Sequence, residues 1–584
     1  MKKNITYNLL VFSLLCAVSI VFAQSPPQKG QLGKDVMQQQ KNAAVAAPPA
    51  KRPAAAPKSM VEIIHSDFVI GDEENLPGVQ VLKGNVQFKH DNALMYCDSA
   101  YFYQADNSLD AFNNVRIIQA DTLFVYGDYL FYNGNTRLAE LRENVRMVNR
   151  RAVLTTDSLN YDRNTNIAYY FTGGKIKDDK NTLTSVWGQY STATSVAIFR
   201  KNVHLTNPSF VMTSDTLHYN TKTHIADIVG QTHIKHQKET DIYSTKGWYN
   251  TENERSMLLN RSLVVNQSGK TLTGDTVFYD KKQNYGEGFQ NVELTDTAQG
   301  TTLSGDYVFY NELTDYGFAT DSALLIYWKE TENAYIHADT LQTLKDSIFN
   351  VALGFHNVRM YRSDIQGIAD SLAYSARDSV INFYGLPVVW SQGSQMSGEQ
   401  IRIFTKNQQA DSVRILKNAM ISQATDSAQY FNQISGKEII AQLDSGQLKH
   451  VRVNGNAESV FYPVDDSDST IIFMNKTKSS FIDMYFVNKK IYKIKTTTKT
   501  DANGYPLEQL SDDQLYLRNF FWLEEQQPKN PIDVFTYYAD KERVMPSVAP
   551  STKGVASDTK GVAPSKKGET RKSAVPNLSS ETYK

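Results

Sequence analysis

The stretch "RENVRMVNRRAVLTTDSLNYDRNTN", residues 142–166, carries the two sequence motifs that decide the fold. In "ENVRM" the apolar Val145 and Met147 alternate with Arg146, and in "DSLNY" Leu159 and Tyr161 alternate with polar neighbours. A period of two places the apolar residues on one face of an extended chain. The polar segment "DRNTN" that follows is typical of a turn. The stretch therefore predicts short strands joined by polar turns.

Both motifs recur in phase along the chain. The first, Asp-x-(Leu/Val)-x-Tyr, occurs as "DYLFY" at 128, "DSLNY" at 157, "DTLHY" at 215, "DTVFY" at 275, "DYVFY" at 306 and "DSLAY" at 370. The second occurs as "GNVQF" at 84, "NNVRI" at 113, "ENVRM" at 143, "KNVHL" at 201, "QNVEL" at 290 and "HNVRM" at 356. One repeat of ~30 residues cannot bury its apolar face alone, so neighbouring repeats must stack. We therefore predict an elongated all-β, β-solenoid-like stack whose two faces close around an apolar interior.

The two ends of the chain differ from the repeats. Lys2 and Lys3 precede an apolar run at 9–22 and the small residue Ala23, which is typical of a secretory signal peptide over residues 1–23. A lipoprotein anchor at Cys16 is the alternative, but bulky Leu15 stands where a small residue is expected. We therefore expect secretion to the periplasm. A Pro/Ala-rich linker at 24–58 and a tail at 547–584 have few bulky apolar residues, so both are predicted to be disordered.

Composition and motifs give no evidence of catalysis or of nucleic-acid binding. Lys+Arg 61 against Asp+Glu 62 leaves a formal net charge of −1, so no global field favours nucleic acid. His233 and His236 differ in parity and lie on opposite faces of a strand, whereas zinc needs convergent ligands. The motif aspartates are expected to cap turns through local backbone N–H groups rather than to bind calcium. Cys97 is expected to be a small buried residue, and we predict no catalytic residue, no metal and no cofactor.

The apolar residues of the motifs are candidates for an inner wall. Two interpretations are open, a fully packed core and a groove that an apolar ligand enters. The residues expected to face inward, and to contact lipid in such a groove, are Val86, Phe88, Val115, Ile117, Val145, Met147, Leu159, Val203, Leu205, Leu217, Val277 and Val292.

The order of D-x-L-x-Y, polar turn, short segment and G-N-V-x-apolar resembles the OstA family, the LptA/LptC/LptD periplasmic domain of lipopolysaccharide transport. "VLKGNVQFKHDNALMYCDSAYFY" (81–103) and residues 142–166 carry the resemblance most clearly, and it covers about residues 60–460. It implies an open β-jellyroll whose hydrophobic groove holds the acyl chains of lipid A. On this basis we expect two OstA-like jellyroll arrays, 59–235 and 236–464, and a C-terminal β extension at 465–546.

The resemblance also implies a function and partners. We expect a periplasmic protein of lipopolysaccharide transport that binds lipid A acyl chains in its groove, bridges towards the outer membrane and is associated with it, and is not an enzyme. Its partners would be lipopolysaccharide, other transport components including an outer-membrane barrel, and further copies joined end to end through exposed edge strands. The LptD branch carries a barrel after this domain, whereas only about 120 residues follow position 460, and the LptA branch is much shorter than this chain. Two alternatives stay open: a structural or adhesive secreted β-solenoid with a filled core and no lipid ligand, and an enzyme that uses the aspartate series.

Overall fold

The computed structural model describes residues 59–536, except 73, 238–239, 329–331, 407–408, 426–428, 445–446, 466–469 and 488–489. The chain divides into two units, Met1–Ser59 and Met60–Lys584, and all described residues except Ser59 belong to the second unit. The predicted signal peptide at 1–23, linker at 24–58 and tail at 547–584 lie outside the described residues.

Strands make up most of the described structure. The first are β1 (Glu62–His65), β2 (Phe68–Gly71), β3 (Val79–His90), β4 (Ala93–Tyr103), β5 (Ser108–Gln119), β6 (Leu123–Asn133), β7 (Leu138–Asn149), β8 (Ala152–Asp162), β9 (Ile167–Tyr170), β10 (Gly174–Asp178), β11 (Asn181–Ser185), β12 (Trp187–Ser191), β13 (Val196–Thr206), β14 (Phe210–Asn220), β15 (Ile225–Ile228), β16 (Thr232–His236), β17 (Thr240–Ser244), β18 (Lys246–Asn250) and β19 (Arg255–Asn266). They are followed by β20 (Thr271–Asp280), β21 (Tyr285–Asp296), β22 (Thr301–Asn311), β23 (Tyr316–Thr320), β24 (Leu324–Tyr327), β25 (Ala334–His337), β26 (Thr340–Asp346), β27 (Phe349–Arg362), β28 (Ile365–Ser375), β29 (Val380–Tyr384), β30 (Val388–Ser391), β31 (Ser394–Ser397), β32 (Gln400–Lys406), β33 (Gln409–Ala424), β34 (Phe431–Asp444), β35 (Gln447–Phe461), β36 (Met474–Val487), β37 (Lys490–Thr497) and β38 (Asp501–Tyr505).

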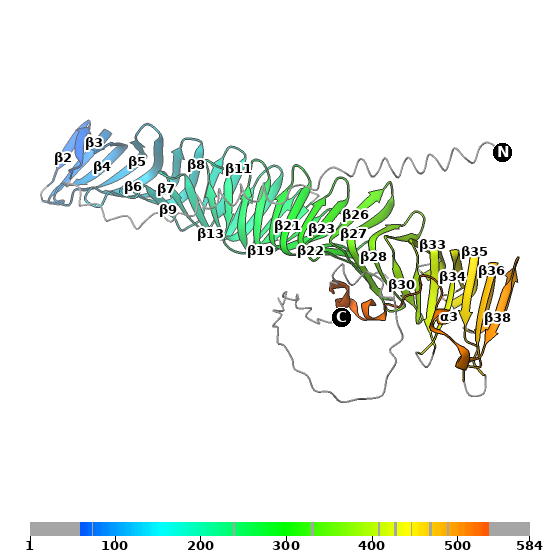
Figure 1. Cartoon of the computed structure of the whole chain (residues 1–584). Helices are drawn as coiled ribbons and strands as arrows, with labels where there is room; N and C mark the ends of the chain where they lie inside the picture. Colours follow the sequence, from blue (N-terminus) through cyan, green and yellow to red (C-terminus); the bar gives the residue numbers. More distant parts are fainter. Residues whose placement is uncertain are drawn as a thin grey trace, which may run out of the picture. The chain divides into compact units, whose positions relative to one another are not determined.

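Most long strands pair with the next strand of the sequence, and the pairings are antiparallel. β3 to β8 form a continuous series in which each strand pairs with the next. Further along, two short strands often replace one long strand, as where β9 and β10 both pair with β8. Figure 1 shows the strands of this unit following one another in the order of the sequence. The predicted all-β stack of repeats is confirmed.

A β-bulge bends each long strand that carries the second motif. In β5 the pairing register breaks between Phe112 and Val115, and Asn113 and Asn114 have φ angles of 62° and 49°. Asparagine tolerates this left-handed region better than most residues, which explains why the motif places Asn before Val. Pairs of positive-φ residues recur at the same place in β3, β7, β13, β19, β21, β27 and β33. The strand halves on either side of the bulges form two walls around the interior.

One hydrophobic cluster fills the interior from Val61 to Met484. It contains residues from both walls, such as Leu109 before the bulge of β5 and Ile117 after it. The outward residues of the same strands are polar, as Arg116 is between the buried Val115 and Ile117. The cluster passes through the positions 235/236 and 464/465, and the division into two arrays stays a prediction.

The last described residues leave the sheet. β36 to β38 continue the stack, whereas residues 506–536, which we call the strap, contain the short helices η1 (Leu507–Gln509), α3 (Asp512–Leu515), η2 (Glu524–Gln526) and η3 (Pro531–Phe535). The strap packs on outward apolar side chains of earlier strands: Leu517 contacts Met420 and Val460, and Phe521 contacts Val388 and Trp390.

Side-chain amides hold the strap along its length. Gln433 donates to the carbonyl of Leu515 (2.8 Å) and accepts from the backbone N–H of Leu517 (2.8 Å). Gln395 makes the same two bonds with Phe521 and Leu523, each at 2.8 Å. These paired bonds satisfy the strap backbone without adding a strand.

Candidate functional site

The twelve residues predicted to face inward do so. Each has an exposed fraction of 2% or less, and the structure brings all of them together in the one hydrophobic cluster. They are Val86, Phe88, Val115, Ile117, Val145, Met147, Leu159, Val203, Leu205, Leu217, Val277 and Val292. A contact with lipid stays a prediction for them, and their burial means that the interior around them is closed.

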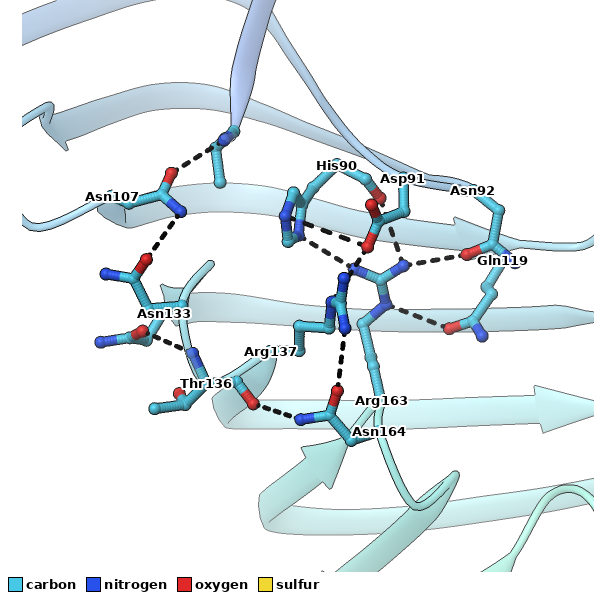
Figure 2. A network of polar contacts seen from close by, with 12 residues as sticks. His90, Asp91, Asn92, Asn107, Gln119, Asn133, Thr136, Arg137, Arg163 and Asn164 are labelled. Atoms are coloured by element: carbon cyan, nitrogen blue, oxygen red, sulfur yellow. Dashed lines mark hydrogen bonds and ion pairs between the residues drawn. The ribbon is translucent and has the colours of Figure 1, made fainter. Parts of the chain in front are cut away.

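A line of polar contacts, which we call the seam, closes the interior where the free ends of the two walls meet. His90, at the end of β3, contacts the hydroxyl of Tyr132, at the end of β6, with 2.6 Å between Nδ1 and the oxygen. Arg163 donates to the same hydroxyl (2.6 Å). Arg163 also donates to Asn92 (3.0 Å), and Arg137 pairs with Asp91 (3.0 Å), as Figure 2 shows. The tyrosine of the first motif therefore has an apolar ring in the core and a polar end in the seam.

The seam continues through the following repeats. Asn149 donates to the hydroxyl of Tyr190 (3.1 Å), and His236 contacts the hydroxyl of Tyr249 (2.9 Å). Between them the hydroxyl of Tyr219 donates to Asp178 (2.7 Å). Burial raises the pKa of the Asp178 carboxyl, although the hydrogen bond from Tyr219 acts in the opposite direction. Residues 90–249 thus enclose a packed core with a polar closure.

The interior opens after residue 290. A cavity of about 630 Å³ lies between the two walls, in the size range of ligand-binding pockets. Its apolar lining includes Leu294, Leu303, Leu325, Tyr327, Ile336, Leu344, Val351, Ala352, Met360, Leu372, Tyr374 and Ile381. None of the twelve predicted residues lines it. The partly buried apolar residues that pack against the core include Ile336, Ala352, Tyr374, Ile381, Ala410, Leu443 and Leu448, all in this later part.

Inward glycines near the cavity do not create it. Positions that hold Leu141 and Phe199 in β7 and β13 hold Gly288 and Gly354 in β21 and β27. A Cβ atom added at Gly288 would lie 2.3 Å from Val292, and one at Gly317 would lie 2.6 Å from Thr343, so neighbouring side chains already occupy the space that these glycines leave. The cavity-lining residues Ile336, Ala352 and Ile381 lie outside the stretches that match the two motifs, so the motifs did not point to them.

Charged residues flank the mouth of the cavity. Lys270 pairs with Asp296 (3.0 Å) and with Asp315, and Lys345 also pairs with Asp315 (2.6 Å). Burial acts to raise the pKa of the Asp315 carboxyl, but hydrogen bonds from Lys270 and Lys345 hold it below its ordinary value. Arg362 and Lys406 are also part of the lining. The rim of the apolar cavity therefore holds the lysines Lys270 and Lys345 paired with Asp296 and Asp315, which belong to the same lining.

The acidic residue of the first motif pairs with the asparagine of the next bulge. Asn114 donates to Asp98 (2.7 Å), Asn291 to Asp275 (2.6 Å) and Asn357 to Asp339 (2.9 Å). The further pairs are Asn85–Asp67, Asn144–Asp128 and Asn418–Glu399. We call these the corner pairs. The expectation that the aspartates cap local backbone N–H groups was wrong for these residues, because the bulge brings an amide from the next strand to the carboxylate.

The cysteine and the two histidines considered above for catalysis or metal binding each have an environment that indicates a structural role. Burial raises the pKa of the Cys97 thiol to about 12, so the side chain is a neutral thiol at pH 7. His233 pairs with Asp241 (2.7 Å) on the outer face, whereas His236 is buried in the seam. Within the described residues no group of three or more His, Cys, Asp or Glu side chains could hold a metal ion. None of the helices in the described part of the chain is long and apolar enough to cross a membrane.

Comparisons with known proteins find the following similarities. Residues 58–215 match the family model of the OstA-like protein. A search of curated proteins finds no match. Among solved structures, the chain is similar to LptH, the LptA-homologous periplasmic component of the lipopolysaccharide transport device from Pseudomonas aeruginosa, with 15% sequence identity and a TM-score of 0.19. That match covers 25% of this chain and 99% of the LptH chain.

Proposed function

We propose that the protein is a periplasmic component of lipopolysaccharide transport, on the ground that residues 58–215 match the family model of the OstA-like protein. In this proposal the interior shelters the acyl chains of lipid A from water, and the polar part of the lipid stays outside. The work is binding and guidance of a lipid, and it needs neither a catalytic residue nor a cofactor.

The cavity between residues 294 and 381 is the observation that carries the proposal. It combines apolar side chains such as Leu303, Ile336 and Met360 with a charged rim, on which Lys270 and Lys345 pair with Asp296 and Asp315. An amphiphile with acyl chains and a polar head group matches this arrangement, because the chains leave water while the polar part stays at the rim. We therefore move the site of lipid binding from the twelve motif residues to this later part of the interior.

The closed part of the body has a different role in the proposal. Residues 90–249 have a packed core and a polar seam, so they act as a rigid spacer that extends the protein across the periplasm. This same feature favours the second candidate function, a structural or adhesive secreted β-solenoid without a lipid ligand. The two candidates differ in whether lipid enters the cavity.

Edge strands provide the proposed contacts with partners. β1 and β2 pair only with β3 among the described strands, and β37 and β38 pair only with β36. Such edges carry unpaired backbone groups that another chain can extend. We propose that copies of the protein, or other transport components that include an outer-membrane barrel, join at these ends near the outer membrane.

Photocrosslinking in cells tests the proposed function. We expect a benzophenone amino acid at Ile336 or Ile381 to crosslink to lipopolysaccharide, because both side chains line the cavity. The same amino acid at Leu217, which is fully buried in the closed part, should give no lipid crosslink. A lack of lipid crosslinks at both cavity positions would favour the filled-core solenoid.

A cavity-filling variant provides the second test. Ala352→Phe places a ring into the cavity, so the lipid recovered with the purified protein should fall at least about fivefold. Val211→Phe adds the same ring at a position on β14 that is 41% exposed and should leave lipid recovery unchanged. Equal lipid recovery from both variants, with equal melting temperatures, would contradict a site in this cavity.

A further inference from the structure

A second depression lies on the outer surface, along the line of bulges. It has a volume of about 620 Å³ and crosses β13, β14, β16, β17 and β19. Its lining includes the exposed residues Asn202, Asp215, Gln231, Tyr243 and Asn260. It is formed by outward side chains and corner positions, so it is distinct from the cavity inside the body.

The depression coincides with a run of repeats in which the corner pairs are broken. Val186 replaces the acid opposite Asn202, and Gln231 replaces the asparagine opposite Asp215. At the third corner both members are replaced, because Thr245 stands opposite Arg261. The backbone keeps the geometry of the intact corners, because Val186 donates its N–H to the carbonyl of Lys201 (3.1 Å) as Asp67 does to the carbonyl of Gly84 (2.9 Å). The first two of these three adjacent repeats therefore each keep half of a pair.

The remaining halves, Asn202 and Asp215, have no side-chain partner of their own. Within the described residues, no hydrogen bond is formed by their side chains or by those of the neighbouring Gln231 and Asn260. In the intact repeats the groups equivalent to Asn202 and Asp215 bond to each other, as Asn114 does to Asp98. Three amides and one carboxylate thus line the depression with their hydrogen-bonding capacity unused.

An aromatic platform borders these groups. Tyr243 is 45% exposed, and its ring stacks on that of His233 with 4.4 Å between centroids and 3° between planes. His233 is itself held by Asp241 (2.7 Å), so the platform is fixed. A fixed aromatic ring presents a flat apolar face beside the polar amides.

We infer that this corner depression binds a glycan. Amides both donate and accept hydrogen bonds, which suits hydroxyl groups, and the tyrosine ring suits the C–H face of a sugar. One carboxylate, Asp215, and one cation, Arg261, which pairs with Glu293 (3.1 Å), give the lining no strong charge for a phosphate or a metal ion. The glycan belongs either to the saccharide part of a lipopolysaccharide or to the cell wall.

Calorimetric titration of the full chain tests this site with two probes. One is the core oligosaccharide released from lipopolysaccharide by mild acid, and the other is chitotetraose. Saturable binding of either probe supports the site and identifies its source. The absence of saturable binding with both probes would overturn it. Neither probe has acyl chains, so the outcome is independent of lipid binding in the interior.

Two variants link the binding to the depression. Tyr243→Ala removes the platform and should lower the association constant at least about tenfold. Val186→Asp restores a corner pair with Asn202 and should lower the association constant at least about fivefold. Its thermal stability should be preserved, because Val186 is 40% exposed. Tyr101→Ala, which removes an exposed tyrosine outside the depression, is the control and should bind as the wild type does. Unchanged affinity in both test variants, with their melting temperatures preserved, would show that any glycan binds elsewhere.

Discussion

The side chain of Asn144 stabilises a backbone conformation that few residues tolerate. Its φ is 49°, where most L-residues are disfavoured by roughly 1–2 kcal/mol, and its amide donates to Asp128. We expect Asn144→Ala to lower the free energy of unfolding by about 1 kcal/mol and Asp128→Ala by less. Urea unfolding of both single variants and of the double variant should give a coupling energy of about 0.5 kcal/mol.

The corner formed by Val186 and Asn202, where no pair exists, is the matched control for this double-mutant cycle. Asn202 has a φ of 51° but faces valine instead of an acid, so the cycle of Asn202→Ala with Val186→Ala should give no coupling energy. Equal coupling energies at the two corners would show that the corner pair does not stabilise the bulge.

The orientation of single side chains could be predicted from the sequence, but their partners could not. Alternation within a strand correctly placed Val145 and Met147 inside and Arg146 outside. The partner of Asp128 is Asn144, 16 residues along the chain, and it reaches the carboxylate only because the bulge turns the strand. The regular distance between Asp and Asn in the repeats contained that information, and a reading of each motif separately missed it.

At the scale of elements, the strap depends on two glutamines. Gln395 and Gln433 each make two hydrogen bonds to its backbone, and both side chains are buried. We expect Gln395→Ala to weaken the attachment of the strap by about 1–3 kcal/mol, because buried backbone groups lose their partners. Hydrogen exchange should then be faster at the backbone amide of Leu523, whereas Gln189→Ala on β12 should leave it unchanged. An unchanged exchange rate in Gln395→Ala would contradict this role.

The strap itself could not be assigned from its own sequence, because the two glutamines that hold its backbone lie more than 80 residues earlier in the chain. Gln433 is 82 residues from Leu515, and Gln395 is 126 residues from Phe521. The information was present in the earlier strands. Val388 and Met420 occupy the outward position that holds Arg116 and Arg146 in the first repeats, and such an outward apolar residue needs a cover.

At the scale of the whole described unit, repetition in phase predicted the all-β stack, since every copy specifies the same strands and the same inward face. Whether the interior is closed or open was not predicted. It depends on how side chains from several strands fit together between the two walls, which no single copy of a motif specifies. The same two sequence motifs occur in the closed part and in the part that contains the cavity, so the motifs do not distinguish the two.

A stack of repeats also ends in edges, which leads to a prediction for assembly. Val69 on β2 is 60% exposed and Ile494 on β37 is 47% exposed, so each edge strand has an exposed apolar residue, and no described strand pairs with its outer side. We expect the full chain to associate end to end as its concentration rises, and Val69→Lys with Ile494→Lys to abolish this because charge on an edge strand opposes pairing. Sedimentation velocity measures the association. Val211→Lys, at an equally exposed apolar position on the inner strand β14, should associate as the wild type does. Loss of association in Val211→Lys, or its persistence in the double variant, would mean that the copies join through a face and not through the edge strands.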